Sequence, residues 1–209
     1  MGQVVGGPGR RAPIHDALID LCVERGFGEV SVEDLCRRTG VGRAEFEASY
    51  DGLGDCFTRC FEAELERFHQ RLDPIRKGDA PWRERVRNTG YELYELFRED
   101  ERATRFLVFE VRTGGEAALR LFGSEIEEMV DLIDEGRKCL ENPGSLSRST
   151  AEQIAGGYFV QLYAVVLRGP LPPVEEMIPQ LMYSAVLPYL GEEAAAEELA
   201  MAAPARGAG

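Results

Sequence analysis

The sequence is poor in histidine, the side chain that most often serves as a general base near neutral pH. Its 209 residues include two histidines, His15 and His69, in unrelated contexts, so a catalytic triad has no evident base. A GxSxG elbow, an HExxH helix, a phosphate-binding P-loop and a dinucleotide fingerprint are also missing. We therefore expect no enzymatic activity, no catalytic residues and no cofactor.

Cysteine is present in an odd number, five, and without a CxxC pair. Cys56 and Cys60 are four residues apart, so they could place two metal ligands on one helix face. No further ligand pattern accompanies them, and buried reduced thiols without a metal site are the preferred interpretation. Reduced thiols, together with the lack of an apolar secretory segment, predict a cytoplasmic protein.

Long apolar runs and a basic excess are absent as well. No run of about 18 apolar residues exists, so we expect no membrane-spanning helix. The net charge of −13 argues against a general nucleic-acid coat protein and against a binder of anionic membranes. Residues 1–12, with their glycines and with Arg10 and Arg11, are expected to form a disordered arm.

Strand-like alternation is missing too, and what the chain contains is helical periodicity. Apolar residues recur at helical spacing, and most prolines and glycines fall between the periodic segments. The pattern predicts an all-α fold. Beyond the first 50 residues, helices are expected over 54–72, 82–97, 101–113, 116–139, 149–168 and 174–189.

Residues 14–61 are the most informative segment. A first helix begins near residue 14 and ends at Gly26. Ser31 and Asp34 have the spacing of a capping box at the start of a second helix, which ends at Gly40. Gly40-Val41-Gly42 is a tight turn, and a third short helix follows from Arg43 to about Tyr50. Two short helices joined by a glycine turn are typical of the DNA-reading helix-turn-helix, whose second helix enters the major groove.

This segment resembles the tetracycline-repressor (TetR) family of bacterial regulators. The resemblance is carried by the run ERGF at 24–27, the run SVEDLCRRTGV at 31–41, and Phe46 with Tyr50. It implies an N-terminal three-helix DNA-binding domain followed by a larger helical domain that binds an effector. It also implies a homodimer in which the last two helices of each subunit form a four-helix bundle.

Two positions depart from the family pattern. Members commonly have a tyrosine directly after the position of Phe46 and a lysine in the turn before the next helix, and both usually contact DNA phosphates. This chain has Glu47 and Leu53 there. Residues 1–72 contain 9 arginines, no lysine and 13 acidic residues, a net charge of 9 − 13 = −4. Because phosphate contacts supply most of the non-specific affinity, we expect weak and salt-sensitive DNA binding.

The expected DNA-binding residues combine the arginines of the arm and of the second helix with the turn and the third helix. They are Arg10, Arg11, Ser31, Arg37, Arg38, Gly42, Arg43, Ala44, Glu45, Glu47, Ser49 and Tyr50.

The domain organisation follows from these patterns. We expect a disordered arm at 1–12, a helix-turn-helix domain at 13–53, a helical effector-binding and dimerisation domain at 54–190, and a flexible tail at 191–209. Within the helix over 149–168 the stretch 158–167 is apolar nearly all round, so it must be covered on several sides. A dimer interface built from this helix and the one over 174–189 provides that cover; an intrachain core is the alternative.

The middle helices are rich in aromatic residues, which are either plain core or the lining of a pocket for a small hydrophobic effector. The candidate lining residues are Trp82, Tyr94, Phe97, Phe106, Phe109, Arg112, Met129, Tyr158, Gln161, Leu162 and Tyr163.

Two functional hypotheses remain at this point. The first is a homodimeric repressor that binds double-stranded operator DNA and is released by a small hydrophobic effector. The second keeps the fold without the DNA contact, as a helical ligand-binding or protein-interaction dimer. In that case the helix-turn-helix domain over 13–53, here called the reading head, would be degenerate. Glu45, Glu47 and Leu53 support the second hypothesis.

Overall fold

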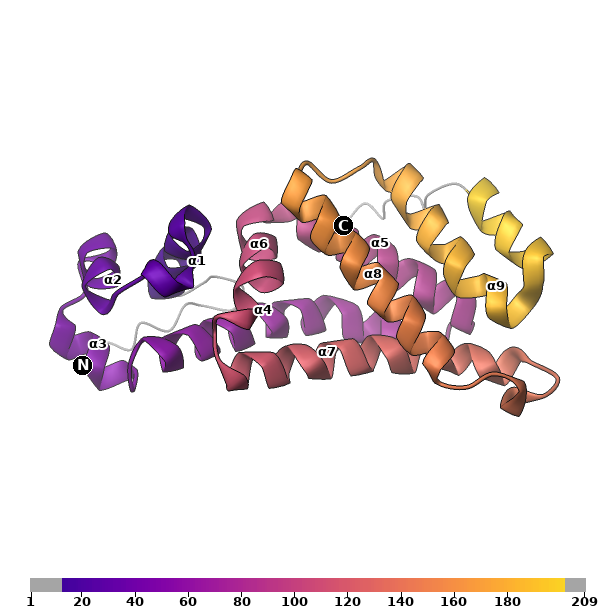
Figure 1. The fold of residues 1–209 in the computed structure, drawn as a ribbon, viewed down its shortest axis with the longest axis horizontal. Coiled ribbons are helices and arrows are strands. Elements are labelled where there is room, and N and C mark those ends of the chain that lie inside the picture. Colours follow the sequence, from indigo (N-terminus) through magenta and orange to yellow (C-terminus); the bar gives the residue numbers. More distant parts are fainter. Residues whose placement is uncertain (1–12, 202–209) are drawn as a thin grey trace. The chain divides into compact units, whose positions relative to one another are not determined.

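The computed structural model describes residues 13–201, and every regular element in that range is a helix (Figure 1). The α-helices are α1 (Pro13–Arg25), α2 (Val32–Thr39), α3 (Arg43–Ser49), α4 (Leu53–Arg76), α5 (Trp82–Glu99), α6 (Glu101–Phe109), α7 (Glu116–Asp134), α8 (Ser149–Arg168) and α9 (Val174–Ala200). Short 3-10 helices lie at Phe27–Glu29 (η1), Glu110–Arg112 (η2), Glu135–Cys139 (η3) and Pro143–Ser145 (η4). The predicted all-α class is confirmed. Within residues 13–201 no helix has both the length and the apolar character needed to cross a membrane.

The described chain divides into two compact units. The first contains residues 13–70 and 99–123, and the second contains 71–98 and 124–201. The sequence analysis places the first boundary at residue 53 instead. The boundary differs because Phe57 and Phe61 of α4 pack with Phe106 of α6 inside the first unit. Most of α4 and all of α6 therefore belong with the helix-turn-helix.

The core of the first unit is a cluster of phenylalanine rings around Phe57. Its ring centroid lies 4.4 Å from that of Phe27 and 4.9 Å from that of Phe106. Gly114 lies against the same ring, because a Cβ added there would come within 2.0 Å of Cε1 of Phe57. Any larger residue at this position would displace the ring from the centre of the unit.

Three cysteines belong to this core. Cys22, Cys56 and Cys60 are buried and unbridged, as expected, whereas Cys36 is partly exposed and Cys139 is exposed. Burial raises the pKa of the Cys22 and Cys56 thiols to about 12, so both stay protonated near neutral pH.

The second unit has its own core, made by α5, α8, α9 and the C-terminal part of α7. Buried residues from these helices include Val86, Ile133, Ala155 and Met182. The indole N–H of Trp82, also buried, donates to the Leu132 carbonyl at 2.8 Å. Helices α8 and α9 run side by side, and α9 covers part of the apolar surface of α8 (Figure 1).

Helix α9 continues to Ala200, where the sequence analysis expects a flexible tail from residue 191. The backbone turns at Gly191 (φ 82°), a left-handed conformation that glycine adopts easily, and the following residues are helical again. Glu198 in this last segment is 1% exposed. Its carboxylate accepts hydrogen bonds from Arg87 at 2.6 and 2.8 Å and is also paired with Arg83. The tail prediction therefore does not hold for residues 192–200, since two arginines of α5 give this segment a buried ionic partner.

The ion pairs of Glu198 lead to a stability prediction. Burial alone would raise the pKa of Glu198, but the hydrogen bonds from Arg87 and Arg83 hold it below its ordinary value. Glu198→Ala leaves two largely buried guanidinium groups without this partner. We expect it to lower the free energy of unfolding by about 3 kcal/mol, measured by urea denaturation followed by far-UV circular dichroism.

Glu197→Ala is the matched control. Glu197 also pairs with Arg83, at 2.8 Å, but its side chain is 57% exposed. Its removal should cost less than about 1 kcal/mol. Equal losses in the two variants would show that the segment after Gly191 is not held by its buried carboxylate.

Candidate nucleic-acid interface

The start of α2 is fixed by the capping box that the sequence predicts. The hydroxyl of Ser31 accepts from the Asp34 N–H at 3.2 Å, and the Asp34 carboxylate accepts from the Ser31 N–H at 3.1 Å. The Ser31 hydroxyl also donates to that carboxylate at 2.6 Å. This side-chain hydrogen bond, assisted by others from Arg25 and Arg37, holds the pKa of Asp34 well below its usual range. The cap therefore persists in weakly acidic solution.

The turn between α2 and α3 is held by local hydrogen bonds. Gly40 ends α2 in the left-handed conformation (φ 76°), and its N–H donates to the Cys36 carbonyl at 2.9 Å. The Thr39 hydroxyl donates to the Leu35 carbonyl at 2.7 Å and accepts from the Val41 N–H at 3.2 Å. These contacts set the direction in which the chain enters α3.

One buried ring and one half-buried ring orient α3. Phe46 is buried in the first unit and fixes the inner face of the helix. Tyr50, at the C-terminal end, places its hydroxyl 3.3 Å from Nε2 of His15 in α1. The guanidinium of Arg59 lies over the Tyr50 ring, 5.5 Å from its centroid. Tyr50 is expected from the sequence to contact DNA, and in the structure its ring holds α3 in place.

Every arginine of the first 70 residues that lies within the described range is paired with a carboxylate. Arg37 and Arg25 pair with Asp34 at 2.9 and 2.8 Å. The pairs, in chain order, are Arg25–Asp34, Arg37–Asp34, Arg38–Glu24, Arg43–Glu33, Arg43–Glu47, Arg59–Asp55 and Arg67–Glu64. Within the described residues, the arginines expected to contact phosphates are therefore already paired with acidic neighbours.

Arg43, the first residue of α3, is the most fully engaged of them. Its Nε donates to Glu47 at 2.8 Å, and Nη1 pairs with Glu33 of α2. The hydrogen bond to Glu47, with the charge of Glu33 beside it, raises the pKa of Arg43. Exposed pairs of this kind contribute about 0–1 kcal/mol, so a DNA phosphate can displace them. The displaced carboxylates would then remain close to the phosphate.

The reading head is tied to α6 and η2 within the first unit. The N–H of Phe27 in η1 donates to the Glu110 carboxylate at 2.9 Å. Arg102 of α6 pairs with Asp20 of α1 and lies 4.0 Å from Asp16. Through these contacts a shift of α6 would be transmitted directly to α1 and η1, which precede the helix-turn-helix.

Most of the predicted DNA-binding residues are exposed in the structure. Arg10 and Arg11 lie outside the described residues. The hydroxyl of Ser31 is used in the cap. The exposed members of the set are Arg37, Arg38, Gly42, Arg43, Ala44, Glu45, Glu47 and Ser49.

Sequence reasoning missed the acidic partners Glu24 and Glu33. Glu24 lies 14 residues before Arg38, and Glu33 lies 10 residues before Arg43. A helical i,i+3 or i,i+4 spacing could have identified the Arg37–Asp34 and Arg43–Glu47 pairs. Pairs between different helices have no such signal.

The residues expected to line an effector site are divided between the two units. Phe106, Phe109 and Arg112 belong to the first, and the remaining ones belong to the second. In the second unit the hydroxyl of Tyr94 donates to the Pro172 carbonyl at 2.8 Å, and that of Tyr158 donates to a carbonyl of α9. The indole of Trp82 is likewise satisfied by backbone. Three members are at the surface of the described chain, namely Arg112, Gln161 and Tyr163.

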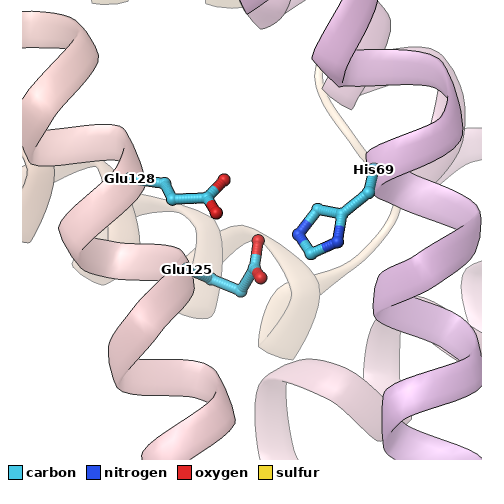
Figure 2. Close-up of side chains that lie close together, drawn as sticks. All are labelled: His69, Glu125 and Glu128. Atoms are coloured by element: carbon cyan, nitrogen blue, oxygen red, sulfur yellow. The ribbon is translucent and has the colours of Figure 1, made fainter.

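Two further groups of side chains bear on ligand binding. A cleft of about 450 Å³ in the second unit is lined by Asp131, Asp134, Glu135, Arg137, Lys138 and Pro143, a charged set that contains no predicted effector residue. Figure 2 shows His69 of α4 with Glu125 and Glu128, whose side chains extend from one face of α7. Because His69 belongs to the first unit and both glutamates to the second, we assign no metal site to them.

A capped helix-turn-helix lies in the first unit, and a helical bundle makes up the second. No family model matches the chain, and no curated protein matches it. Solved structures do. FadR of Bacillus halodurans, a fatty acid degradation regulator, has a TM-score of 0.72 at 13% identity, over 83% of this chain and 96% of that one.

Two further structures agree. The transcriptional regulator FadR of Bacillus subtilis, solved in complex with stearoyl-CoA, has a TM-score of 0.69 at 16% identity, over 86% of this chain and 98% of that one. A TetR-like transcriptional regulator from Rhodococcus sp. RHA1 has a TM-score of 0.70 at 19% identity, over 90% and 100%. The chain therefore has the TetR-like fold that the sequence resemblance implies.

Proposed function

We propose that this protein is a homodimeric, ligand-responsive transcriptional regulator that acts as a repressor on double-stranded operator DNA. The observation that carries the proposal is the exposed α3, held in a fixed direction by the cap of α2, the Gly40 turn and the buried Phe46. A second helix presented in this way is the element that enters the major groove. The fold shared with transcriptional regulators supports the same function.

Electrostatics sets the character of the binding. Arg37, Arg38 and Arg43 are exposed and can reach phosphates once they leave their carboxylate partners. Each such exchange replaces an ion pair within the protein by an ion pair with a phosphate, so the net gain in binding free energy per phosphate is small. We therefore propose weak non-specific affinity, with specific affinity that depends more than usual on base contacts.

The first prediction tests DNA binding itself. Glu47→Gln removes one negative charge and frees Arg43 from its partner on α3. We expect it to strengthen binding to duplex DNA from the region upstream of the protein's own gene by about 3- to 10-fold at low salt. Fluorescence anisotropy at several salt concentrations measures the change.

The control is Glu29→Gln, which makes the same change of charge at an exposed position of η1, outside the helix-turn-helix. It should alter affinity by less than twofold. Equal gains in both variants would mean that net charge, and not the release of Arg43, sets the affinity. If the wild type and both variants bind no duplex DNA, the proposed function is wrong.

The dimer is proposed to form through α8 and α9. In the single chain Val160 and Leu167 on α8 are 67% and 61% exposed, and Leu187 and Leu190 on α9 are also exposed. Gly156 and Gly157 lie on the same helix, with no atom within 4 Å of an added Cβ. Exposed leucine and valine beside open glycine positions favour close packing against a second copy of these helices.

A dimer of this kind makes a second prediction. Val160→Glu and Leu167→Glu should each raise the dimer dissociation constant by at least about 100-fold, because they bury an unpaired charge. Sedimentation equilibrium measures the change. Leu119→Glu, on an exposed leucine of α7 in the first unit, should leave the dimer unchanged. A wild-type monomer at micromolar concentration would contradict the proposal.

The effector is proposed to be a small, largely apolar molecule bound within the helical bundle of the second unit. The half-buried Phe97, Met129 and Leu162 offer apolar area there. The polar groups of Trp82 and Tyr94 are occupied by backbone carbonyls, so area rather than hydrogen bonding would supply most of the affinity. The stearoyl-CoA in the Bacillus subtilis FadR structure makes a long-chain acyl thioester the first probe.

The third functional prediction uses that probe. Stearoyl-CoA should raise the melting temperature in proportion to the logarithm of its excess over the dissociation constant, and coenzyme A alone should not. Phe97→Ala should reduce the rise, measured against its own ligand-free melting temperature, whereas Leu119→Ala should not. If coenzyme A and stearoyl-CoA act equally, the apolar chain is not what the protein recognises.

The alternative function has one specific observation in its favour. Because each described arginine of the reading head is paired, the surface that would face DNA carries an unrelieved acidic excess. A helical ligand-binding or protein-interaction dimer needs no phosphate contact and would therefore tolerate this acidic surface. The DNA-binding measurement above separates the two functions.

A further inference from the structure

The outward face of α3 is built from small and acidic side chains. Successive residues of an α-helix are rotated by about 100°, so with Phe46 pointing inward, Ala44 and Ala48 lie about 160° from it. Glu45 and Glu47 flank this alanine pair on opposite sides, each about 100° from Phe46. The two alanines and the two glutamates are all exposed. The alanines let the helix approach a groove closely, so the two carboxylates would reach the base edges.

The two glutamates differ in their partners. Glu47 accepts a hydrogen bond from Nε of Arg43 at 2.8 Å, and Arg43 pairs in addition with Glu33. The carboxylate of Glu45 has no hydrogen bond or ion pair within residues 13–201. Its backbone carbonyl accepts from the Ser49 hydroxyl at 3.1 Å, which is a contact inside the helix. Glu45 is therefore the acidic group of α3 that remains available to a ligand.

A carboxylate can only accept hydrogen bonds, and this restricts what it can contact in the major groove. Guanine presents two acceptors there, and thymine presents an acceptor and a methyl group. Cytosine presents the N4 amino donor alone, whereas adenine places an acceptor, N7, directly beside its N6 amino group. Of the four bases, cytosine is thus the one whose edge is complementary to an unpaired carboxylate.

The cost of a mismatch strengthens this selectivity. Close to DNA, Glu45 loses water and lies in the field of the phosphates, and both effects are unfavourable. A cytosine amino group offsets them with a charge-assisted hydrogen bond. Guanine and thymine leave the charge unpaired, and adenine places its N7 acceptor beside the carboxylate, so the residue discriminates mainly by rejecting wrong sequences.

We propose that Glu45 is a specificity-determining residue, whose carboxylate accepts a hydrogen bond from the N4 amino group of one cytosine in each operator half-site. The inference rests on the proposed DNA-binding function and adds to it a defined base. It predicts that a protein with few free cations obtains its sequence preference from an anion on its reading helix.

The test is a binding selection from a random duplex library with the full-length chain, followed by sequencing of the bound pool. The wild type should enrich a site with one cytosine position per half-site that Glu45→Ala no longer enriches, while the other positions persist. In that site, replacing the C·G pair by T·A should weaken wild-type binding about fivefold or more and leave Glu45→Ala binding nearly unchanged. Glu45→Gln should move the preference towards adenine, because a glutamine amide pairs with N6 and N7.

Glu29→Gln, at an exposed position of η1 outside the helix-turn-helix, is the control with the same loss of charge. It should retain the cytosine preference. If Glu45→Ala enriches the same bases at every position as the wild type, the inference is overturned while the DNA-binding function stands. If the wild type enriches no sequence and binds no duplex, the proposed function fails, and the inference fails with it. Because Glu45 is exposed and its side chain has no partner in the described chain, the variants should keep the wild-type circular dichroism spectrum.

Discussion

The packing of the Phe57 ring is the contact on which the first unit depends. This ring meets Phe27 from the reading head, Phe61 from its own helix and Phe106 from α6. Gly114 gives it the space that a Cβ would occupy. Aromatic rings in tilted and stacked arrangements of this kind favour defined geometries. The helix-turn-helix is consequently packed with α4 and α6 in one unit, and this packing sets the direction of α3 within the unit.

The acidic balance of the reading head imposes a different kind of constraint. A regulator with many free lysines and arginines gains affinity for any DNA and selects its site afterwards. In this protein the arginines are held by Asp34, Glu24, Glu33 and Glu47, so the proposed DNA binding would gain little affinity without a matching sequence. Low non-specific affinity would release such a protein from wrong sites quickly and lower competition from the rest of the genome. The charge pattern that weakens binding can therefore improve discrimination.

The second unit has a buried core on the inner side of its helices and an exposed apolar surface on α8. Inside, its core closes over Trp82 and Tyr189, whose rings meet edge to face at 5.3 Å. Outside, Val160 and Leu167 leave α8 with an apolar face that a single chain does not cover. The buried carboxylate of Glu198 fastens the last helical segment to α5 and so limits how α9 can move. A rearrangement of the helices in the second unit would change both the core and the exposed apolar surface, because α8 and α9 contribute to each.

The sequence by itself determined the local features. The Ser31–Asp34 cap and the end of α2 at Gly40 depend on contacts a few residues apart, so spacing alone predicts them. The all-α class and the exact span of α8 follow from periodicity in the same way. Tertiary structure alone decided which charges of different helices meet. Arg38 finds Glu24 across two helices, and Arg87 finds Glu198 from 111 residues away, which also makes a helix of an expected tail. Such pairs depend on how the helices pack. The sequence around one member of a pair therefore does not identify the other member, which comes close only in the folded chain.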